Sequence, residues 1–233
     1  MTDGSLLDTS GCPIILWEGF AQQRCQGYEL TADLDFDTNA DGQMNELDAY
    51  WNDGEGWEPI GSSDSDAFYA DFNGNGHQIR NLYIDRAGYA GLFGYILGTS
   101  IQPVKITQLV ITGPMTSVTA SNDAGILAGT IGYTEVDRVF ISGRVSTQRN
   151  AGGLAGEIYY STVSNVFSSA DILTGSTQGG LIGRLTNSTL SDSLSTGYVD
   201  SDGGLLGYSY HNNNESLYWA TDTSTRSTSS GSN

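Results

Sequence analysis

The sequence predicts an all-β fold: a right-handed parallel β-helix (β-solenoid) with a short N-terminal capping helix and an inserted calcium loop. Two observations point to the solenoid. A glycine phrase close to Gly-Gly-Leu-x-Gly occurs five times, at residues 90–94, 124–128, 152–156, 179–183 and 203–207, and a short apolar-polar run precedes each copy. Internal repeats of about 20 to 50 residues indicate a solenoid or a propeller. A repeat this small buries its apolar side only against a neighbouring repeat.

The spacing of the repeats favours a solenoid over a propeller. The second residues of the phrases, at 91, 125, 153, 180 and 204, are 34, 28, 27 and 24 residues apart. Propeller blades need about 40 to 50 residues. Equivalent residues of the apolar-polar runs are Tyr83, Val110, Phe140, Phe167, Leu194 and Leu217. Paired glycines suit tight corners, and the predicted right hand follows the usual crossover preference. An irregular β-sandwich stays an alternative.

Composition divides the chain into three regions. We expect an N-terminal cap with an acidic calcium-loop region over residues 1–78, the solenoid over 79–220 and a flexible Ser/Thr-rich tail over 221–233. Residues 13–24 begin with proline and are rich in apolar side chains, which predicts a short helix that caps the first rung. Residues 28–36 alternate apolar and polar side chains, which predicts a strand.

The charge of the chain excludes some partners. Acidic residues outnumber basic ones 27 to 9, and the formal net charge is -18. Nucleic acid and anionic membrane surfaces are therefore not expected as partners. Residues 26–78 hold thirteen Asp or Glu and no Lys or Arg, but they also hold aromatic residues such as Trp51 and Trp57. This mixture predicts a folded segment neutralised by cations rather than a disordered acidic tail.

Export is expected from features outside the repeats. No apolar stretch reaches the roughly 18 residues of a membrane span, and no signal peptide is visible, so we expect no membrane insertion and a piece of a longer exported protein. Cys12 and Cys25 are thirteen residues apart. In an oxidising compartment they are expected to form a disulfide, which would stabilise the fold by roughly 3 kcal/mol. Two free thiols in a cytosolic protein are the alternative.

Residues 37–48 carry the strongest chemical signal. Oxygen-bearing side chains stand at positions 1, 3, 5, 9 and 12 of this twelve-residue segment, and Gly42 stands at position 6. This is the spacing of a calcium loop, in which the glycine permits a sharp turn and position 7 offers its carbonyl. The predicted Ca²⁺ ligands are the side chains of Asp37, Asn39, Asp41 and Asp48, the backbone of Gln43, and Asn45 directly or through water. An acidic turn that binds nothing is the alternative.

The glycine phrases resemble the GLUG motif repeats of large bacterial surface proteins. Residues 28–35, 57–61, 72–79 and 217–224 share this resemblance, which extends over roughly residues 25 to 229. It implies an exported, repeat-containing β-solenoid segment of an adhesin-like or cell-envelope protein, and it transfers no catalytic residues. Ala128 departs from the pattern, because the other phrases end in glycine. The calcium segment is similar to the loops of dockerin modules, with Asp48 in place of the more familiar Glu.

Catalysis has little support in the sequence. The chain has two histidines and no visible Ser-His-Asp or Cys-His arrangement. We expect a non-enzyme: a calcium-stabilised module at the cell surface or outside the cell, whose partner is a glycan, a protein receptor or another copy of itself. A carbohydrate-active enzyme on a β-helix is one alternative, and it predicts acids and an Arg on adjacent turns. A self-assembling filament is another.

Three further groups are weaker candidates. Residues 71–77 are expected to form a plain turn rather than a second cation site, and His211 is expected to be solvated. The aromatic side chains that could form a sugar- or peptide-binding surface, or else a stacking ladder, are Tyr159, Tyr160, Tyr208, Tyr210, Tyr218 and Trp219.

Overall fold

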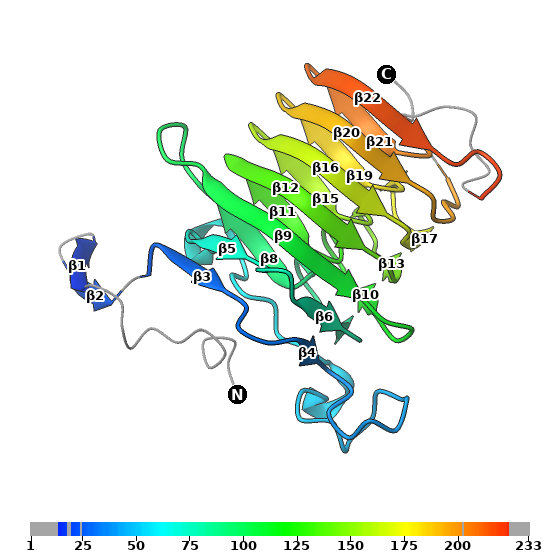
Figure 1. The fold of residues 1–233 in the computed structure, drawn as a ribbon. Coiled ribbons are helices and arrows are strands. Elements are labelled where there is room, and N and C mark those ends of the chain that lie inside the picture. Colours follow the sequence, from blue (N-terminus) through cyan, green and yellow to red (C-terminus); the bar gives the residue numbers. More distant parts are fainter. Residues whose placement is uncertain (1–13, 18–19, 24, 202, 224–233) are drawn as a thin grey trace.

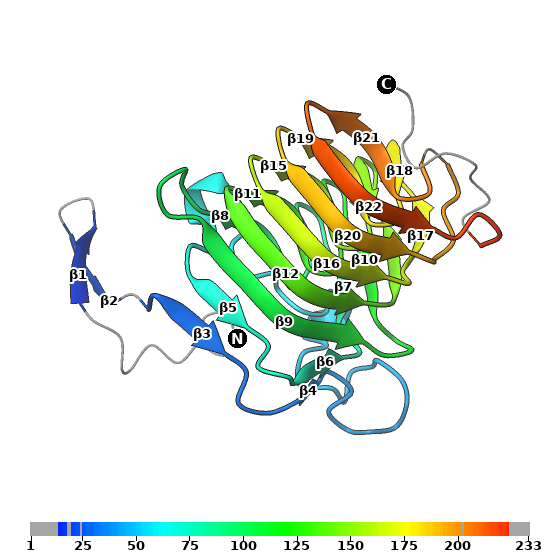
Figure 2. The ribbon, with the colours of Figure 1, turned by 45° about the horizontal axis from the view of Figure 1, so that its top comes forward.

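Parallel strands stacked along one axis form the fold. In a computed structural model, the described residues are 14–17, 20–23, 25–201 and 203–223. Most of their strands pair into three parallel sheets that share one axis (Figures 1 and 2). The predicted all-β parallel solenoid is therefore confirmed.

Between residues 83 and 195, each turn of the solenoid contributes one strand to each of these sheets. The five-stranded sheet contains β8 (Phe93–Leu97), β11 (Ala128–Gly132), β15 (Ala155–Tyr159), β19 (Ile182–Thr186) and β21 (Leu206–Tyr210). The nine-stranded sheet contains β3 (Gly27–Glu29), β4 (Leu34–Asp35), β5 (Asp71–Asn73), β6 (Gln78–Arg80), β9 (Val104–Thr112), β12 (Thr134–Ile141), β16 (Thr162–Ser168), β20 (Thr189–Ser195) and β22 (Asn213–Trp219). The four-stranded sheet contains β7 (Tyr83–Asp85), β10 (Ser117–Thr119), β13 (Arg144–Ser146) and β17 (Asp171–Thr174). A short pair, β14 (Asn150–Gly152) and β18 (Thr177–Gly179), lies at one corner.

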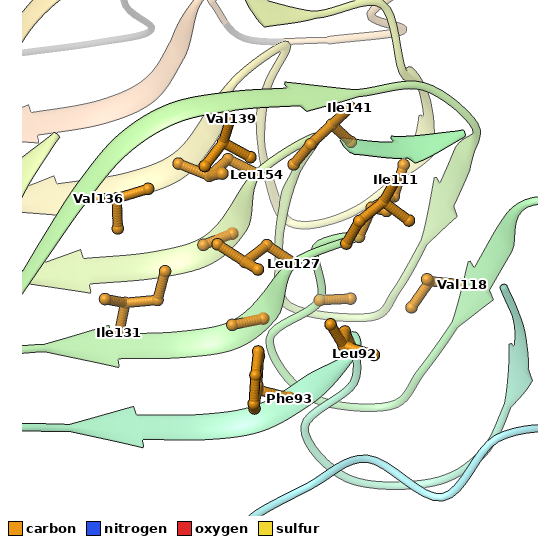
Figure 3. Close-up of a cluster of buried hydrophobic side chains, with 14 of the residues drawn as sticks. Leu92, Phe93, Ile111, Val118, Leu127, Ile131, Val136, Val139, Ile141 and Leu154 are labelled. Atoms are coloured by element: carbon orange, nitrogen blue, oxygen red, sulfur yellow. The ribbon is translucent and has the colours of Figure 1, made fainter. Parts of the chain in front are cut away.

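Inward side chains stack in register along the axis. Ile96, Ile131 and Ile158 pair across successive strands of the five-stranded sheet, and all three are fully buried. The leucine of each glycine phrase also points into the core, as Figure 3 shows for Leu127 and Leu154. Because each rung buries its apolar side chains against the same residues of the next rung, the hydrophobic core is continuous.

The register corrects two details of the predicted repeat. On the nine-stranded sheet the paired residues are Val110, Phe140, Phe167, Leu194 and Tyr218, so Tyr218 takes the place expected for Leu217, whereas Tyr83 lies in another sheet. These paired side chains are half-buried or exposed on the outer face. Ala128 pairs with Phe93 and Ala155, so the second phrase ends at Gly129 and its terminal glycine is displaced by one residue.

The terminal glycines stack backbone against backbone. They are Gly94, Gly129, Gly156, Gly183 and Gly207. A Cβ on Gly183 would lie 2.6 Å from the carbonyl oxygen of Gly156, and a Cβ on Gly207 would lie 2.5 Å from that of Gly183. Real Cβ atoms do not approach backbone this closely, so the rungs can stack at this corner only where the side chain is absent.

The capping helix predicted over 13–24 is wrong. The described residues of this segment form an antiparallel hairpin of β1 (Ile14–Trp17) and β2 (Phe20–Gln23), in which Ile14 lies opposite Gln23. The β-branched isoleucines and the aromatic side chains favour strands, and a short apolar run does not distinguish the two states. The strand predicted over 28–36 is split into β3 and β4.

Residues 55–70 cover the N-terminal end of the solenoid instead. Gly56 forms an isolated bridge with Ile84 of β7, and Ile60 and Phe68 form bridges with Phe93 and Ile96 of β8. The Trp57 indole Nε1 donates a hydrogen bond of 3.0 Å to the Leu92 carbonyl oxygen, and the ring is 4% exposed. This segment also contains the short 3₁₀ helix η3 (Asp64–Asp66), and η2 (Asn52–Gly54) precedes it.

Candidate functional site

The predicted calcium loop follows β4 and projects from the N-terminal end of the solenoid (Figure 1). Its residues form turns and bends rather than strands or helices. The Asp37 carboxylate accepts hydrogen bonds from the backbone N–H groups of Asp41 at 3.2 Å and Gly42 at 3.0 Å. Asp41 in turn accepts the N–H of Gln43 at 2.8 Å. The Asp37 carboxylate therefore lies inside the turn and accepts the backbone N–H groups that surround it.

The remaining predicted side chains gather at the same place. The Asn45 Nδ2 group donates to Asp41 Oδ2 at 2.9 Å, and the Asn39 Nδ2 group donates to the same oxygen at 3.3 Å. Asp48 is buried, and its carboxylate accepts the backbone N–H groups of Thr38 at 2.8 Å and Asn45 at 2.9 Å. Side-chain hydrogen bonds thus join Asn39, Asp41 and Asn45, whereas Asp37 and Asp48 each hold the loop through its backbone N–H groups.

Two residues of the loop have left-handed backbone conformations. Ala40 has φ 58° and Gly42 has φ 81°. The positive φ at Gly42 accounts for glycine at position 6, since other residues adopt this conformation at a cost. The sharp turn expected from the spacing is present.

The donor set of the loop suits a hard cation. Across the described part of the chain, no group of three or more His, Cys, Asp or Glu side chains forms a metal cluster. A cation at this loop would therefore depend on amide and carbonyl oxygens as well as on its carboxylates. Ca²⁺ accepts such mixed oxygen ligands, usually six to eight of them.

An aromatic cluster connects the loop to the end of the solenoid. Phe36 directly precedes the loop, and Tyr50 follows it by two residues. The ring centroids of Phe36 and Tyr50 are 5.2 Å apart. The centroid of the Trp57 ring lies 5.5 Å from that of Phe36 and 5.8 Å from that of Tyr50. Since Trp57 is hydrogen-bonded to the first rung, the loop stem packs against a residue that closes the end of the solenoid.

A second candidate region lies on the outer face of the five-stranded sheet. One row of outward residues crosses all five strands in register: Tyr95, Thr130, Glu157, Arg184 and Tyr208. Arg184 Nε lies 3.5 Å from Glu157 Oε1, and the Arg184 guanidinium carbon lies 5.3 Å from the centre of the Tyr208 ring. An acid, a guanidinium and an aromatic ring therefore stand side by side on three neighbouring strands.

Tyrosines cover the N-terminal half of this face. Tyr159 passes over Gly132, where a Cβ would collide with its ring, and its hydroxyl bonds with that of Tyr95 at 2.9 Å. Burial raises the pKa of both phenols. Tyr133 and Tyr160 stack at 5.1 Å between ring centroids. Tyr160 thus stacks on a ring of the preceding rung, as the ladder interpretation expects, whereas Tyr159 meets Tyr133 edge to face.

Asp123 lies beside this row. Its side chain is 2% exposed, and its Oδ1 accepts a hydrogen bond of 2.8 Å from the Asn150 Nδ2 group. Arg149 Nε lies 4.0 Å from the same oxygen. Burial raises the pKa of the Asp123 carboxyl, and burial together with the Asp123 charge raises that of Glu157. Shifted carboxyl pKa values mark candidate functional positions.

The Thr130 hydroxyl is buried without a hydrogen-bond partner in the described structure, and the residue is 2% exposed. An unsatisfied buried hydroxyl is destabilising, so Thr130→Val is expected to raise the free energy of unfolding by about 1 kcal/mol. Thr134 provides the matched control, because it is 1% exposed and its hydroxyl donates to the Gly132 carbonyl oxygen at 2.9 Å. Thr134→Val is expected to lower the free energy by about 1 kcal/mol. Urea unfolding measures both, and a loss of stability in Thr130→Val would contradict the assignment.

The weaker candidates have structural roles. Of the residues expected to form a turn, 74–77 do so, whereas Asp71–Asn73 form β5, and His77 Nδ1 lies 3.0 Å from Asp33 Oδ1. The backbone and side-chain hydrogen bonds from Gln78, followed by that of His77, lower the pKa of the Asp33 carboxyl. His211 is exposed and stacks on Tyr210.

The predicted disulfide and the predicted aromatic surface have different outcomes. Cys12 lies outside the described residues, so its disulfide with Cys25 stays a prediction. The aromatic residues expected to share one surface do not, since Tyr218 and Trp219 belong to β22 in a different sheet from Tyr208 and Tyr210.

Comparisons with known proteins give two partial relatives. The chain is 38% identical over 115 residues to Halomucin of Haloquadratum walsbyi, which covers 48% of this chain and 1% of that protein. It is 32% identical over 129 residues to a Gly-rich membrane protein of Evansella cellulosilytica, which covers 54% of this chain and 12% of that protein. The chain thus spans a small part of the length of either relative.

No family model matches the chain, so the resemblance to GLUG repeats stays a prediction. No solved structure matches it either. Among the described residues there is no helix of the length and hydrophobicity needed to cross a membrane.

Proposed function

We propose that this chain is a non-catalytic, calcium-stabilised β-solenoid module of an exported surface protein, acting in adhesion or as an extracellular structural segment. The observation that carries the proposal is the continuous stack of similar rungs, whose outer faces present tyrosine, serine and threonine side chains. Such a stack offers an extended surface and lengthens by adding rungs. One relative is named Halomucin and the other is named a Gly-rich membrane protein, and both names are consistent with a surface location.

Calcium has a structural role in this proposal. The loop carries four carboxylates within twelve residues, three of them at predicted ligand positions, and the surrounding segment has no Lys or Arg before Arg80 to balance them. A bound cation would relieve this repulsion and hold the stem formed by Phe36 and Tyr50 against Trp57. Asp37, Asn39, Asp41, Gln43, Asn45 and Asp48 are the residues that would hold the ion.

Saturating Ca²⁺ is expected to raise the melting temperature by about 5 to 10 °C relative to a chelator. A ligand at 100 times its Kd stabilises by about 2.7 kcal/mol, and each kcal/mol shifts a domain of this size by about 2 to 4 °C. Asp41→Asn should abolish most of the shift, because it removes a ligand charge but keeps an acceptor for the Gln43 N–H. Calorimetry with and without chelator measures the effect.

Glu46→Gln is the matched control for the calcium prediction. Glu46 is an exposed acid of the same loop at position 10, which is not a predicted ligand position. This variant removes the same charge and should keep the full calcium shift. An equal loss of the shift in both variants would mean that Ca²⁺ acts only through general charge screening. No shift in the parent chain would refute the structural ion.

A carbohydrate-active enzyme is the second candidate. Glu157 and Arg184 project from neighbouring strands of one face and Asp123 lies beside them, which is the arrangement this alternative predicts. However, Asp123 is 2% exposed and held by Asn150, so Glu157 is the carboxyl of this group that a substrate could reach. Glycosidases use two carboxyl groups that both touch substrate. Release of reducing ends or unsaturated products from a polysaccharide would establish the enzyme and overturn the non-catalytic proposal.

A further inference from the structure

We infer that the C-terminal half of the five-stranded face, around Glu157, Arg184 and Tyr208, binds an uncharged glycan chain. This inference rests on the proposed adhesive function and adds the class of ligand and the residues that bind it. It concerns recognition and includes no chemical step. The argument rests on spacing, on unused hydrogen-bonding capacity and on charge.

The three residues form a straight row on a rigid support. They occupy equivalent positions on β15, β19 and β21, which pair in parallel without interruption at these residues. Neighbouring strands lie about 4.8 Å apart, so the row is about 10 Å long. This length suits two successive sugar rings. Since each side chain stands on a strand of the ladder, the row is ordered before any ligand binds.

Hydrogen-bonding groups on the row remain available. In the described part of the chain, the Glu157 carboxylate has its ion pair with Arg184 and no hydrogen bond, and its side chain is 25% exposed. The Arg184 side chain is 46% exposed. The Tyr208 hydroxyl has no hydrogen-bond partner among the described residues either. A carboxylate acceptor, a guanidinium with five donors and a ring with a polar tip are the groups that a polyhydroxylated ligand can use.

The charges favour a ligand without formal charge. Glu157 and Asp123 are balanced locally by Arg184 and Arg149, so donors and acceptors coexist with no net charge in the group. The whole chain carries a formal charge of -18, which opposes the approach of a polyanion. A cation is disfavoured by the two guanidinium groups. Hydroxyl-rich, uncharged chains satisfy these conditions.

The edge of the row supplies an aromatic platform. The Arg184 guanidinium carbon lies 5.3 Å from the centre of the Tyr208 ring, which holds both groups in place. Tyr210 lies two residues further along β21 and is 50% exposed. A sugar ring could pack its apolar side on these phenol rings while its hydroxyls reach Glu157 and Arg184. Because the row crosses three rungs along the axis, a chain rather than an isolated monosaccharide fits it.

Binding to defined hexasaccharides tests the inference. The probes are β-1,4- and α-1,4-linked glucose and galactose hexamers as neutral chains, with a polyuronate hexamer as the acidic one, measured by calorimetry and NMR titration. We expect at least one neutral hexamer to bind and the polyuronate to bind at least tenfold more weakly. Glu157→Gln and Tyr208→Ala should each weaken binding by about tenfold or more. Melting temperatures confirm that the variants fold.

Tyr218→Ala is the matched control. Tyr218 is 63% exposed on β22, in the nine-stranded sheet, so its loss should leave the affinity unchanged. Binding that prefers the polyuronate, binding that survives both variants of the row, or equal losses in the control would each overturn the inference. Absence of binding to every neutral probe would also overturn it. The calcium-dependent melting shift is measured separately, so these failures leave the proposed calcium-stabilised module standing.

Discussion

Gly183→Ala is expected to lower the free energy of unfolding by about 3 kcal/mol or more. The new Cβ would lie 2.6 Å from the Gly156 carbonyl oxygen and 2.8 and 2.9 Å from the N and O atoms of Ala151. All three are backbone atoms held in a parallel ladder, so the clash is relieved only by separating neighbouring rungs. Overpacking in a core costs about 1 to 3 kcal/mol where side chains can adjust, and here they cannot. Equilibrium urea unfolding followed by far-UV circular dichroism measures the loss.

Gly76→Ala is the control that distinguishes a steric clash between rungs from the cost of a left-handed backbone conformation. Gly76 has φ 81°, but no heavy atom lies within 4 Å of the position of its Cβ. Its replacement should therefore cost about 1 kcal/mol, the price of a left-handed conformation alone. If Gly183→Ala and Gly76→Ala lose the same stability, the glycine ladder has no role beyond local conformation.

The repeat predicted the architecture but not the register. The glycine phrases and their period were sufficient to expect a parallel solenoid, because a short repeat has few other ways to bury apolar surface. The exact pairing depends on which residues lie opposite one another in space. Ala124 pairs with Ala151, and Ala128 pairs with Ala155. An alignment of the two glycine phrases by sequence would instead place residues 124 and 128 opposite residues 152 and 156, so the pairing in space differs from it by one residue. Single-residue shifts of this kind leave no mark in composition.

The two candidate sites differ in how far sequence reasoning reached. The calcium loop is a contiguous segment, so its ligand spacing is visible in the sequence, and Asp37 and Asp48 each accept backbone N–H groups of the loop itself. The row of Glu157, Arg184 and Tyr208 is assembled from three turns of the solenoid. Its members are identified only once the register and the outward side of each strand are known. A search for equivalent positions 24 to 27 residues apart would have found them, given the correct register.

The capping prediction failed for a physical reason. An apolar run of five residues buries equally well as a helix or as a strand, so the pattern of residues 13–24 did not decide between them. The residues that cover the first rung lie later in the chain, around Trp57 and Phe68, where no periodicity marks them. The aromatic residues of the acidic region indicated that it folds, but not that it forms the cap.

Trp57→Ala is expected to cost about 3 to 5 kcal/mol, because it opens a large cavity at the end of the core. The ring is 4% exposed, contacts both Phe36 and Tyr50, and donates its Nε1–H to the Leu92 carbonyl oxygen. Trp57→Phe keeps an aromatic ring but leaves that carbonyl without this donor, so a smaller loss of about 1 to 3 kcal/mol is expected. Urea unfolding of both variants measures the two contributions.

Trp51→Ala is the control that distinguishes the loss of the cap from the loss of any tryptophan side chain. Trp51 is half-buried and stacks on Tyr83 at 5.5 Å between ring centroids, so Trp51→Ala should cost less than half as much as Trp57→Ala. Trp57→Ala should also reduce the calcium-dependent melting shift, because it removes the ring that joins the loop stem to the first rung. Trp51→Ala should leave that shift intact. Coupling through the aromatic cluster requires that Trp57→Ala lose more stability than Trp51→Ala and also show a smaller calcium-dependent melting shift. Equal losses of stability in the two variants, or an unchanged calcium shift in Trp57→Ala, would show that the loop and the cap fold independently.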